Sequence, residues 1–427
     1  MSADTIFALS SGRPPAAVSI IRVSGPLAHA AGKRLGRSLP EPREAGLRVL
    51  RRADGDILDE ALVLRFDGPA SSTGEDIVEF QCHGGRAVVD AVLTELASID
   101  GLRAAVPGEF TRRAFENGRI DLTEAEGLAD LLEAETESQR KAALALAEGG
   151  LRRQVEAWQE CVLQLSARAE AAIDYVDEDS VDPDPGLGRD CAQLADELSD
   201  WLDRPRIEPL KDGVRVVVAG PPNAGKSSLI NAIAGQERAI VTEIPGTTRD
   251  HIEVPLAVAG IPILLTDTAG LREANEPVER IGVERARNLV EAADILLWMG
   301  DPDDAPAGKG PVRVHGRSDL PSRREVPSGS LPVSSTTREG LSELLDVVGR
   351  LARTLLPAEG EMALNRRQAA HIAEARDALA GTVADDADIV LTAEHLRMAR
   401  GAFDRLTGRA GVEDVLDALF GRFCLGK

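Results

Sequence analysis

The chain has 427 residues, a length typical of about three domains. Its 49 Lys and Arg residues against 71 Asp and Glu residues give a formal net charge of −22. This balance excludes a polybasic nucleic-acid coat protein, because phosphate binding needs clustered Lys and Arg. Aromatic residues make up only 3%, which argues against a channel that stacks bases without sequence preference.

Cysteine spacing and the first residues narrow the class further. Cys82, Cys161, Cys191 and Cys424 form no CxxC pair, so we expect reduced thiols rather than a disulfide scaffold or a zinc ribbon. The N-terminus lacks a charged leader with an apolar core, and no apolar run is long enough for a membrane helix. We therefore expect a cytoplasmic protein without membrane contact. Residues 1–52 carry nine basic and three acidic residues, so an anion outside a dedicated pocket would favour this stretch.

Residues 1–118 are predicted to form an α+β domain. VSIIRV (18–23), ALVLRF (61–66) and IVEF (77–80) have the composition of strands, and helical spacing of apolar residues over 87–98 predicts a helix. A helical region begins near Leu122, where Thr123 and Glu126 have the spacing of a capping box. The helical pattern is interrupted at 177–188, resumes in CAQLADELSDWLD and stops near Pro205; it returns after Pro357.

Residues 214–348 alternate buried strands with helical patterns, which predicts a parallel sheet covered by helices. The predicted strands are VRVVVAG, IPILLTD, ADILLWMG and LPVSS. Because helical sequence lies on both sides, the simplest architecture is a helical domain with an inserted α/β domain. We predict four segments: 1–118, 119–211 (helical domain, first part), 212–355 (α/β domain) and 356–427 (helical domain, second part).

The first strand of the α/β unit runs into GPPNAGKS (220–227) and then a helical pattern. This is G-x-x-x-x-G-K-[ST] in its strand–loop–helix context, where backbone N–H groups surround phosphates at a helix N-terminus. Lys226 is expected to reach the outer phosphates, and the Ser227 hydroxyl to bind Mg²⁺.

Later segments complete a switch-type nucleotide site. Thr247 and Thr248 follow in VTEIPGTTRD, and Thr248 suits the Mg²⁺ shell. Asp267 ends the strand ILLTD and suits an indirect Mg²⁺ contact, while the N–H of Gly270 suits the γ-phosphate. In this order, the motifs indicate a nucleoside triphosphatase resembling the GTPase superfamily.

The base-reading segment departs from the superfamily pattern N-K-x-D. Here the residues are Gly316-Arg317-Ser318-Asp319, so Asp319 can accept from guanine but the Asn is missing. Ser334 falls where the last nucleotide loop is expected. GTP is favoured, with a relaxed purine preference as the alternative. A Pro/Gly-rich link replaces the helix expected between LLWMG and VRVH.

The water-orienting group is not evident from the spacing alone. Leu271 follows DTAG and cannot orient a water. Arg272, Glu273, Glu276 and Glu279 come next, with a solvated helix start as the alternative interpretation of these acids.

Several longer motifs resolve these choices by resemblance. PNAGKSSLINAIAG, VTEIPGTTRD, DTAGLREAN, TGEDIVEFQCHGG, PGEFTRRAF and the terminal FCLGK together resemble the tRNA modification GTPase MnmE (TrmE) family, from about Ile6 to Lys427. The resemblance implies a homodimer with an N-terminal folate-binding domain, a helical domain and an inserted Ras-like P-loop GTPase domain.

The resemblance also implies site residues. Asn223, Thr242, Thr247 and the backbone carbonyl of Ile244 would hold K⁺, Glu279 would orient the water, and Lys226 and Arg272 are further catalytic candidates. The implied GTP site comprises Asn223, Ala224, Gly225, Lys226, Ser227, Ser228, Thr242, Glu243, Ile244, Pro245, Gly246, Thr247, Thr248, Asp267, Thr268, Ala269, Gly270, Asp319 and Ser334.

A reduced folate of the 5-formyl- or methylene-tetrahydrofolate type would contact Arg22, Glu79, Arg119 and Lys427. In this arrangement Arg22 would pair a carboxylate of the folate tail and Glu79 would accept from the pterin. The last five residues would have to fold back onto residues 1–118. Cys424 is either a reactive thiol or a packed side chain.

The resemblance implies a K⁺- and Mg²⁺-dependent GTPase that works with MnmG (GidA) on the wobble uridine of tRNA, adding a carboxymethylaminomethyl or aminomethyl group. FAD and NADH chemistry would belong to that partner, in a heterotetramer, since no G-x-G-x-x-G follows a strand here. Two alternatives are a ribosome-assembly or RNA-binding switch GTPase, which would need a basic appendage, and a folate-dependent transferase, which the intact Gly225-Lys226-Ser227 disfavours.

Overall fold

A computed structural model describes residues 4–174, 186–236, 238–239, 253–268, 287–306, 310–358, 361–384, 388–410, 413–421, 423 and 426. The chain divides into two compact units, each described by itself. The first consists of Met1–Ala129, Leu146–Cys161 and Arg400–Lys427, and the second of Asp130–Ala145 and Val162–Ala399.

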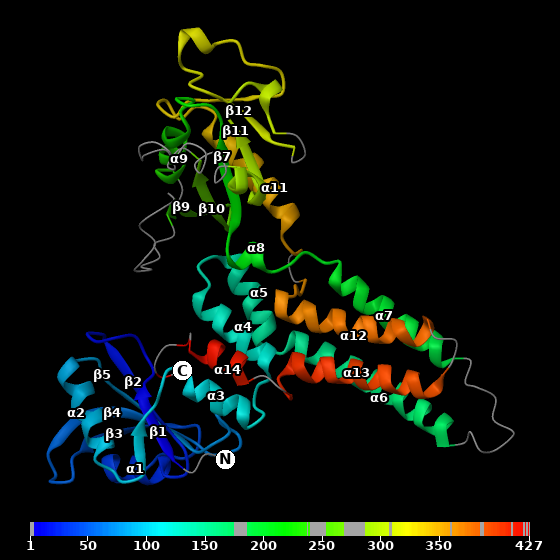
Figure 1. The fold of residues 1–427 in the computed structure, drawn as a ribbon. Coiled ribbons are helices and arrows are strands. Elements are labelled where there is room, and N and C mark those ends of the chain that lie inside the picture. The colour runs from blue at the N-terminus through cyan, green and yellow to red at the C-terminus, as the bar shows by residue number, and fades with distance from the viewer. Residues whose placement is uncertain are drawn as a thin grey trace, which may run out of the picture. The chain divides into compact units, whose positions relative to one another are not determined.

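The first unit is built on a mixed six-stranded sheet with the order β3-β4-β5-β2-β1-β6 (Figure 1). Its strands are β1 (Thr5–Leu9), β2 (Val18–Ser24), β3 (Ala45–Arg51), β4 (Ile57–Phe66), β5 (Ile77–His83) and β6 (Leu102–Ala104). All neighbours are antiparallel except β1 and β6. In β2 the side chains alternate, so Ile21 and Val23 are buried while Arg22 lies on the opposite face.

Helices cover both faces of this sheet. Helices α1 (Ala28–Gly36) and α2 (Arg86–Ala97) pack on the face that carries Ile21 and Val23. Helix α3 (Glu109–Glu116) places Phe110 in a second cluster with Ile6 and Ala8. The Arg22 face therefore lies on the α3 side of the sheet.

Helices occur both before and after the α/β segment. They are α4 (Leu122–Glu133), α5 (Glu137–Ala147), α6 (Gly150–Asp174), α7 (Leu187–Leu202), α8 (Glu208–Lys211), α12 (Arg366–Ala384), α13 (Ile389–Thr407) and α14 (Glu413–Phe420). Within the first unit Trp158 of α6 stacks on Phe403 of α13, with ring centroids 5.8 Å apart. Within the second, α7 packs against α12. Segments on either side of the α/β part thus share cores, as an inserted domain requires.

None of the helices in the described part of the chain combines the length and apolar character needed to cross a lipid bilayer.

The α/β part is a seven-stranded sheet with the order β13-β12-β11-β7-β10-β9-β8. Its elements are β7 (Val214–Ala219), α9 (Lys226–Ala234), β8 (Arg238–Ala239), β9 (Glu253–Val258), β10 (Ile261–Asp267), β11 (Ile295–Trp298), η2 (Pro302–Asp304), β12 (Val312–Gly316), η3 (Pro321–Arg323), β13 (Leu331–Val333) and α11 (Leu341–Leu355). The central strand β7 is buried at five of its six positions, which explains its continuous apolar run.

The predicted parallel sheet is confirmed from β13 to β10, and β9 and β8 extend it with antiparallel pairing that the sequence analysis did not predict. The predicted strands at 18–23, 61–66 and 77–80 correspond to β2, β4 and β5, and the helix at 87–98 to α2. In the described residues of the link between β11 and β12, only the 3-10 turn η2 replaces the usual helix.

The predicted capping box at Thr123 and Glu126 is wrong, because the cap lies two residues earlier. Asp121 Oδ1 accepts from the Glu124 N–H at 2.9 Å, and Glu124 Oε2 accepts from the Asp121 N–H at 2.8 Å. Thr123 instead donates its hydroxyl to Asp121 Oδ1 at 2.8 Å. Asp can cap as well as Thr, so the pattern alone did not distinguish the two positions.

Asp121→Ala is expected to lower the free energy of unfolding by about 1 kcal/mol, since it removes the acceptor for the first turn of α4. Glu133→Ala, at the exposed other end of the same helix, is the matched control and should change stability by less than about 0.5 kcal/mol. Urea denaturation followed by circular dichroism would measure both. Equal effects of the two substitutions would contradict the cap assignment.

Candidate functional site

A phosphate-binding loop, residues 220–225, joins β7 to α9. Gly225, at the N-cap of α9, has φ of 98°, in the left-handed region that favours glycine. Asn223 has φ of 61°, and Asn is among the side chains that adopt this conformation most readily. The unpaired N–H groups of the first turn of α9 therefore follow directly on the loop, which is the arrangement that binds phosphate.

Lys226 and Ser227, the first residues of α9, are fixed by specific contacts. Lys226 Nζ donates to the carbonyl oxygens of Gly220 and Pro221 at 3.0 and 2.9 Å, so the ammonium group lies within the loop. Ser227 Oγ donates to Asp267 Oδ2 at 2.6 Å, at the end of β10. The structure thus brings Lys226, Ser227 and Asp267 together from two elements. Hydroxyl and carboxylate oxygens are the ligands that Mg²⁺ prefers, so this pair fits that ion.

The end of β10 is also fixed to the central strand. The N–H and hydroxyl groups of Thr268 both donate to the carbonyl oxygen of Val218, at 3.4 and 3.0 Å. Asp267 is almost fully buried. Its carboxylate therefore stays directed at the start of α9.

Gly316, the first residue of the predicted base-reading segment, packs directly against Met299. A β-carbon on Gly316 would lie 2.6 Å from Met299 Cε and 3.4 Å from the carbonyl oxygen of Ala224. Arg317 lies over the phosphate loop, since a β-carbon on Gly225 would be 3.6 Å from its Nε. The methyl group of Met299 thus fills the space that a side chain at position 316 would need.

Asp319 and Ser334 lie on adjacent segments. The Ser318 N–H donates to the carbonyl oxygen of Val333 at 3.3 Å, which joins the two loops. Ser334 is fully buried and its Oγ accepts from the Thr337 N–H at 3.0 Å, whereas Asp319 is exposed.

Many predicted site residues lie outside the described part of the chain. These are Thr242, Glu243, Ile244, Pro245, Gly246, Thr247, Thr248, Ala269, Gly270, Arg272, Glu279, Cys424 and Lys427. The predictions for them stay predictions.

In the first unit, Arg22 and Glu79 form a direct pair. They are opposite each other in the β2–β5 ladder, and Arg22 Nε donates to Glu79 Oε1 at 2.8 Å. The Arg22 guanidinium also lies over the Phe110 ring, 5.7 Å from its centroid. Two predicted folate-binding residues therefore share one point on the α3 side of the sheet.

A buried ion-pair network fixes α3, and with it Phe110. Arg113, only 3% exposed, pairs with Asp4, Glu75 and Glu109. Burial acts to raise the pKa of Glu109, but hydrogen bonds from Arg103, the Val106 N–H and Arg113 outweigh it and leave that pKa below its ordinary value.

Arg119 lies beside the segment that precedes β5. A β-carbon on Gly74 would be 3.0 Å from Asn117 Cβ and 3.2 Å from Arg119 Cγ, and Asn117 donates to the carbonyl oxygen of Thr73 at 2.8 Å. Arg119 is exposed, and its backbone N–H donates to the carbonyl oxygen of Ala114 in α3 at 2.8 Å.

The C-terminal segment returns to the first strand, as the sequence analysis required. Ser10 Oγ donates to the carbonyl oxygen of Gly426 at 2.8 Å. Gly426 has φ of 92°, and a β-carbon there would lie 2.1 Å from the carbonyl oxygen of Leu9. Gly426 therefore lies against the end of β1, the strand that pairs with the Arg22-bearing strand β2.

Comparisons with known proteins show which family the chain belongs to. The MnmE helical domain model matches residues 122–424, and the model of the GTP-binding protein TrmE N-terminus matches residues 5–119. A tRNA modification GTPase MnmE of Erythrobacter litoralis is 53% identical over 429 residues, which cover 99% of this chain and 100% of that protein. The chain belongs to the MnmE family.

Two further relatives carry the same description, tRNA modification GTPase MnmE. That of Rhizorhabdus wittichii is 54% identical, covering 100% of this chain and 97% of its own length. That of Novosphingobium aromaticivorans is 52% identical, covering 99% of this chain and all of its own length. The predicted family and fold class are confirmed.

Three residues beside the predicted sites were not identified from the sequence: Met299, Phe110 and Ser10. Phe110 contacts the predicted site residue Arg22, while Met299 and Ser10 contact Gly316 and Gly426, which belong to the base-reading segment and the terminal FCLGK motif. The missing Asn of the base-reading motif was the one available signal, since it raised the question of what replaces that side chain.

The Met299–Gly316 contact predicts that nucleotide binding does not depend on N7 of guanine. Guanine N7 is an acceptor that an amide at position 316 would serve, and a thioether cannot donate to it. We expect 7-deaza-GTP, which lacks N7, to bind as well as GTP. In the double variant Met299→Ala/Gly316→Asn it should bind roughly twofold to tenfold more weakly than GTP. Titration calorimetry with both nucleotides measures this.

Asp319→Asn is the companion variant, because it changes the other base contact. Loss of a charged hydrogen bond of about 1.5–3 kcal/mol should shift preference from GTP towards XTP. If the wild-type protein rejected 7-deaza-GTP, another segment would have to read N7.

Proposed function

We propose that this protein hydrolyses GTP and acts in tRNA modification, as the names of its MnmE relatives describe. The observation that carries the proposal is the contact between Ser227 Oγ and Asp267 Oδ2 at 2.6 Å, directly after the loop that holds Lys226. It joins the phosphate loop to the end of the neighbouring strand, where a γ-phosphate and its metal ion are sensed in switch-type GTPases.

The finer proposal concerns the substrate and partners. The protein forms a cytoplasmic homodimer and a heterotetramer with MnmG (GidA), and acts on the wobble uridine of tRNA to introduce carboxymethylaminomethyl or aminomethyl at carbon 5. FAD and NADH are bound by the partner. The domains follow the boundaries 1–118, 119–211, 212–355 and 356–427.

Within the GTPase site, Ser227 and Thr248 hold Mg²⁺, and Asn223, Thr242, Ile244 and Thr247 hold K⁺. These ions supply positive charge next to the phosphates where negative charge develops during hydrolysis. Lys226 binds the outer phosphates, Glu279 orients the water and Asp319 reads the base. The contacts of Lys226 with the loop and of Ser227 with Asp267 support the roles proposed for Lys226 and Ser227. The roles of the other residues rest on matching motif positions.

The folate site uses Arg22, Glu79, Arg119 and Lys427. Arg22 and Glu79 contact each other at 2.8 Å, so we assign both to one end of the ligand rather than to its tail and pterin separately. Arg22 retains donors besides Nε for a carboxylate, because guanidinium has five N–H groups.

The test compares wild-type and Lys226→Ala protein in two assays. The first measures GTP turnover by the protein, and the second measures wobble-uridine modification in a deletion strain that carries it. Wild-type protein should restore modification and the variant should restore neither activity. The matched control is Arg215→Ala, an exposed position on the adjacent strand β7. Turnover without restored modification would favour a different switch GTPase.

K⁺ dependence is expected to follow Asn223. Hydrolysis should be faster in KCl than in matched NaCl, because Na⁺ is too small for the same oxygen ligands. Asn223→Ala should remove this difference while GDP binding persists, as judged by fluorescent-nucleotide titration. Equal rates of the wild type in the two salts would remove the cation assignment.

Glu279 is expected to act in hydrolysis rather than in binding. Glu279→Ala should slow turnover on the order of a hundredfold and leave nucleotide affinity unchanged. The neighbouring acids supply the matched controls, Glu273→Ala and Glu276→Ala, which should turn over normally. If all three variants behaved alike, Glu279 would be a solvated surface acid.

Gly426→Ala tests the C-terminal segment without deleting it. The new β-carbon would collide with the Leu9 carbonyl oxygen, so folate binding and tRNA modification should fall while GTP hydrolysis continues. Gly12→Ala is the control, since a β-carbon there meets no atom within 4 Å. Modification at the wild-type level in Gly426→Ala would exclude a role for this contact.

A further inference from the structure

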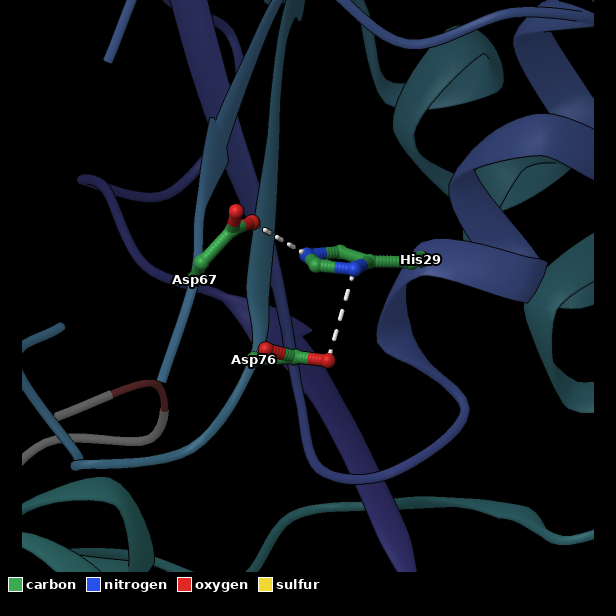
Figure 2. Close-up of side chains that lie close together, drawn as sticks. All are labelled: His29, Asp67 and Asp76. Atoms are coloured by element: carbon green, nitrogen blue, oxygen red, sulfur yellow. Dashed lines mark ion pairs between the residues drawn. The ribbon is translucent and has the colours of Figure 1, made fainter. Parts of the chain in front are cut away.

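His29 of α1 lies between two carboxylates of the first unit (Figure 2). Its Nε2 is 3.3 Å from Asp67 Oδ1, and its Nδ1 is 3.3 Å from Asp76 Oδ2. Asp67 directly follows β4 and Asp76 directly precedes β5, so the ring contacts both ends of the connecting segment 67–76. Among the described residues, these three side chains form the one cluster of metal-ligand type.

The Nε2 atom is buried and has no hydrogen-bond partner. Asp67 Oδ1 is close enough for a hydrogen bond but does not meet its geometry. A buried ring nitrogen without a partner is costly, and a lone pair facing a carboxylate oxygen is repulsive. A cation between the two atoms would remove both penalties.

The separation of these atoms suits one metal ion. Two ligand atoms each about 2.0–2.1 Å from a tetrahedral ion lie about 3.3 Å apart. An ion placed there needs no large movement of either side chain. Asp76 Oδ2 contacts the other ring nitrogen, Nδ1, and so is placed to fix the orientation of the ring (Figure 2).

The carboxylates are already oriented by other donors. Arg65 Nε and Nη2 donate to Asp67 Oδ1 and Oδ2 at 2.7 and 3.0 Å, and the Gly68 N–H donates to Asp76 Oδ1 at 2.9 Å. Each carboxylate oxygen has two lone pairs, so these bonds leave one on Asp67 Oδ1 and do not use Asp76 Oδ2, the oxygen that faces the ring. Such outer contacts hold ligands in place around metal ions.

The local charge also favours a cation. Asp67 and Asp76 carry two negative charges against one positive charge on Arg65. Both carboxylates are partly exposed, at 41% and 37%, so water can complete the coordination. Mixed imidazole and carboxylate ligands suit Zn²⁺ and similar divalent transition ions.

We propose that His29, Asp67 and Asp76 form a binding site for a divalent transition-metal ion of the Zn²⁺ class. His29 Nε2 and Asp67 are the direct ligands from the chain, and Asp76 holds the ring through Nδ1. The ion fastens α1 to both ends of segment 67–76. This site is separate from the GTP site and does not depend on the function proposed above.

The test uses full-length, nucleotide-free protein treated with chelator and then dialysed. Calorimetry should detect one Zn²⁺ per chain that is lost in His29→Gln, and Asp76→Asn should weaken binding by about tenfold to a hundredfold. His83→Gln is the matched control. His83 Nδ1 pairs with one carboxylate, that of Asp59, at 2.7 Å, and should leave zinc binding unchanged.

Co²⁺ provides a second readout that does not depend on folding differences between variants. Visible bands without an intense near-ultraviolet thiolate band would support the nitrogen and oxygen ligands. A thiolate band would place the ion on cysteine and overturn the proposal. So would the absence of Zn²⁺ binding, or unchanged binding by folded His29→Gln protein, in which case His29 is a protonated bridge between the two carboxylates.

Discussion

The C-terminal segment contacts the first domain at two glycines, Gly108 and Gly426, where the backbones are too close for a residue with a side chain. A β-carbon on Gly108 would lie 2.2 Å from the Phe420 carbonyl oxygen, and one on Gly426 would lie 2.1 Å from that of Leu9. Apolar packing reinforces the contact, because Phe420 and Phe423 share a core with Leu122. The last helix must therefore return to the first domain. This return makes the α/β part an insertion within the helices rather than a domain added at one end.

Close packing against glycine also shapes the nucleotide site. Gly316 leaves room for Met299, and Met299 in turn packs beside Gly220 at the start of the phosphate loop. The change from Asn to Gly is therefore not a simple loss, because an apolar contact occupies the volume. The two parts of the site are therefore packed against each other: Met299 lies beside both Gly220 and Gly316, and Arg317 lies against Gly225 of the phosphate loop.

The parts that could be predicted from sequence are those with local signals. Buried parallel strands read as continuous apolar runs, and the phosphate loop has a fixed spacing of Gly, Lys and Ser. Failures occurred where tertiary contacts decide. The cap of α4 uses Asp121 because the Glu124 side chain reaches back to it, and Thr123 is instead buried. The strand β3 was missed because it alternates Arg48 with apolar residues at a sheet edge, where the pattern is weak.

The predicted folate-binding residues Arg22 and Glu79 show the same limit. Arg22 and Glu79 are separated by 57 residues, and nothing in either segment indicates that they face each other. The β2–β5 ladder places them opposite each other, so that their charges compensate in a direct ion pair.

Some of the basic side chains in residues 1–52 form hydrogen bonds with nearby backbone carbonyl groups. Arg48 donates to the Ser38 carbonyl oxygen at 3.1 Å and Arg51 to that of Gly55 at 2.9 Å, so these basic residues stabilise turns and strand ends. The excess of positive charge over residues 1–52 therefore does not by itself make an anion site. The placement of individual charges, such as Arg22 between Glu79 and the Phe110 ring, is set by the fold and cannot be read from the net charge of the segment.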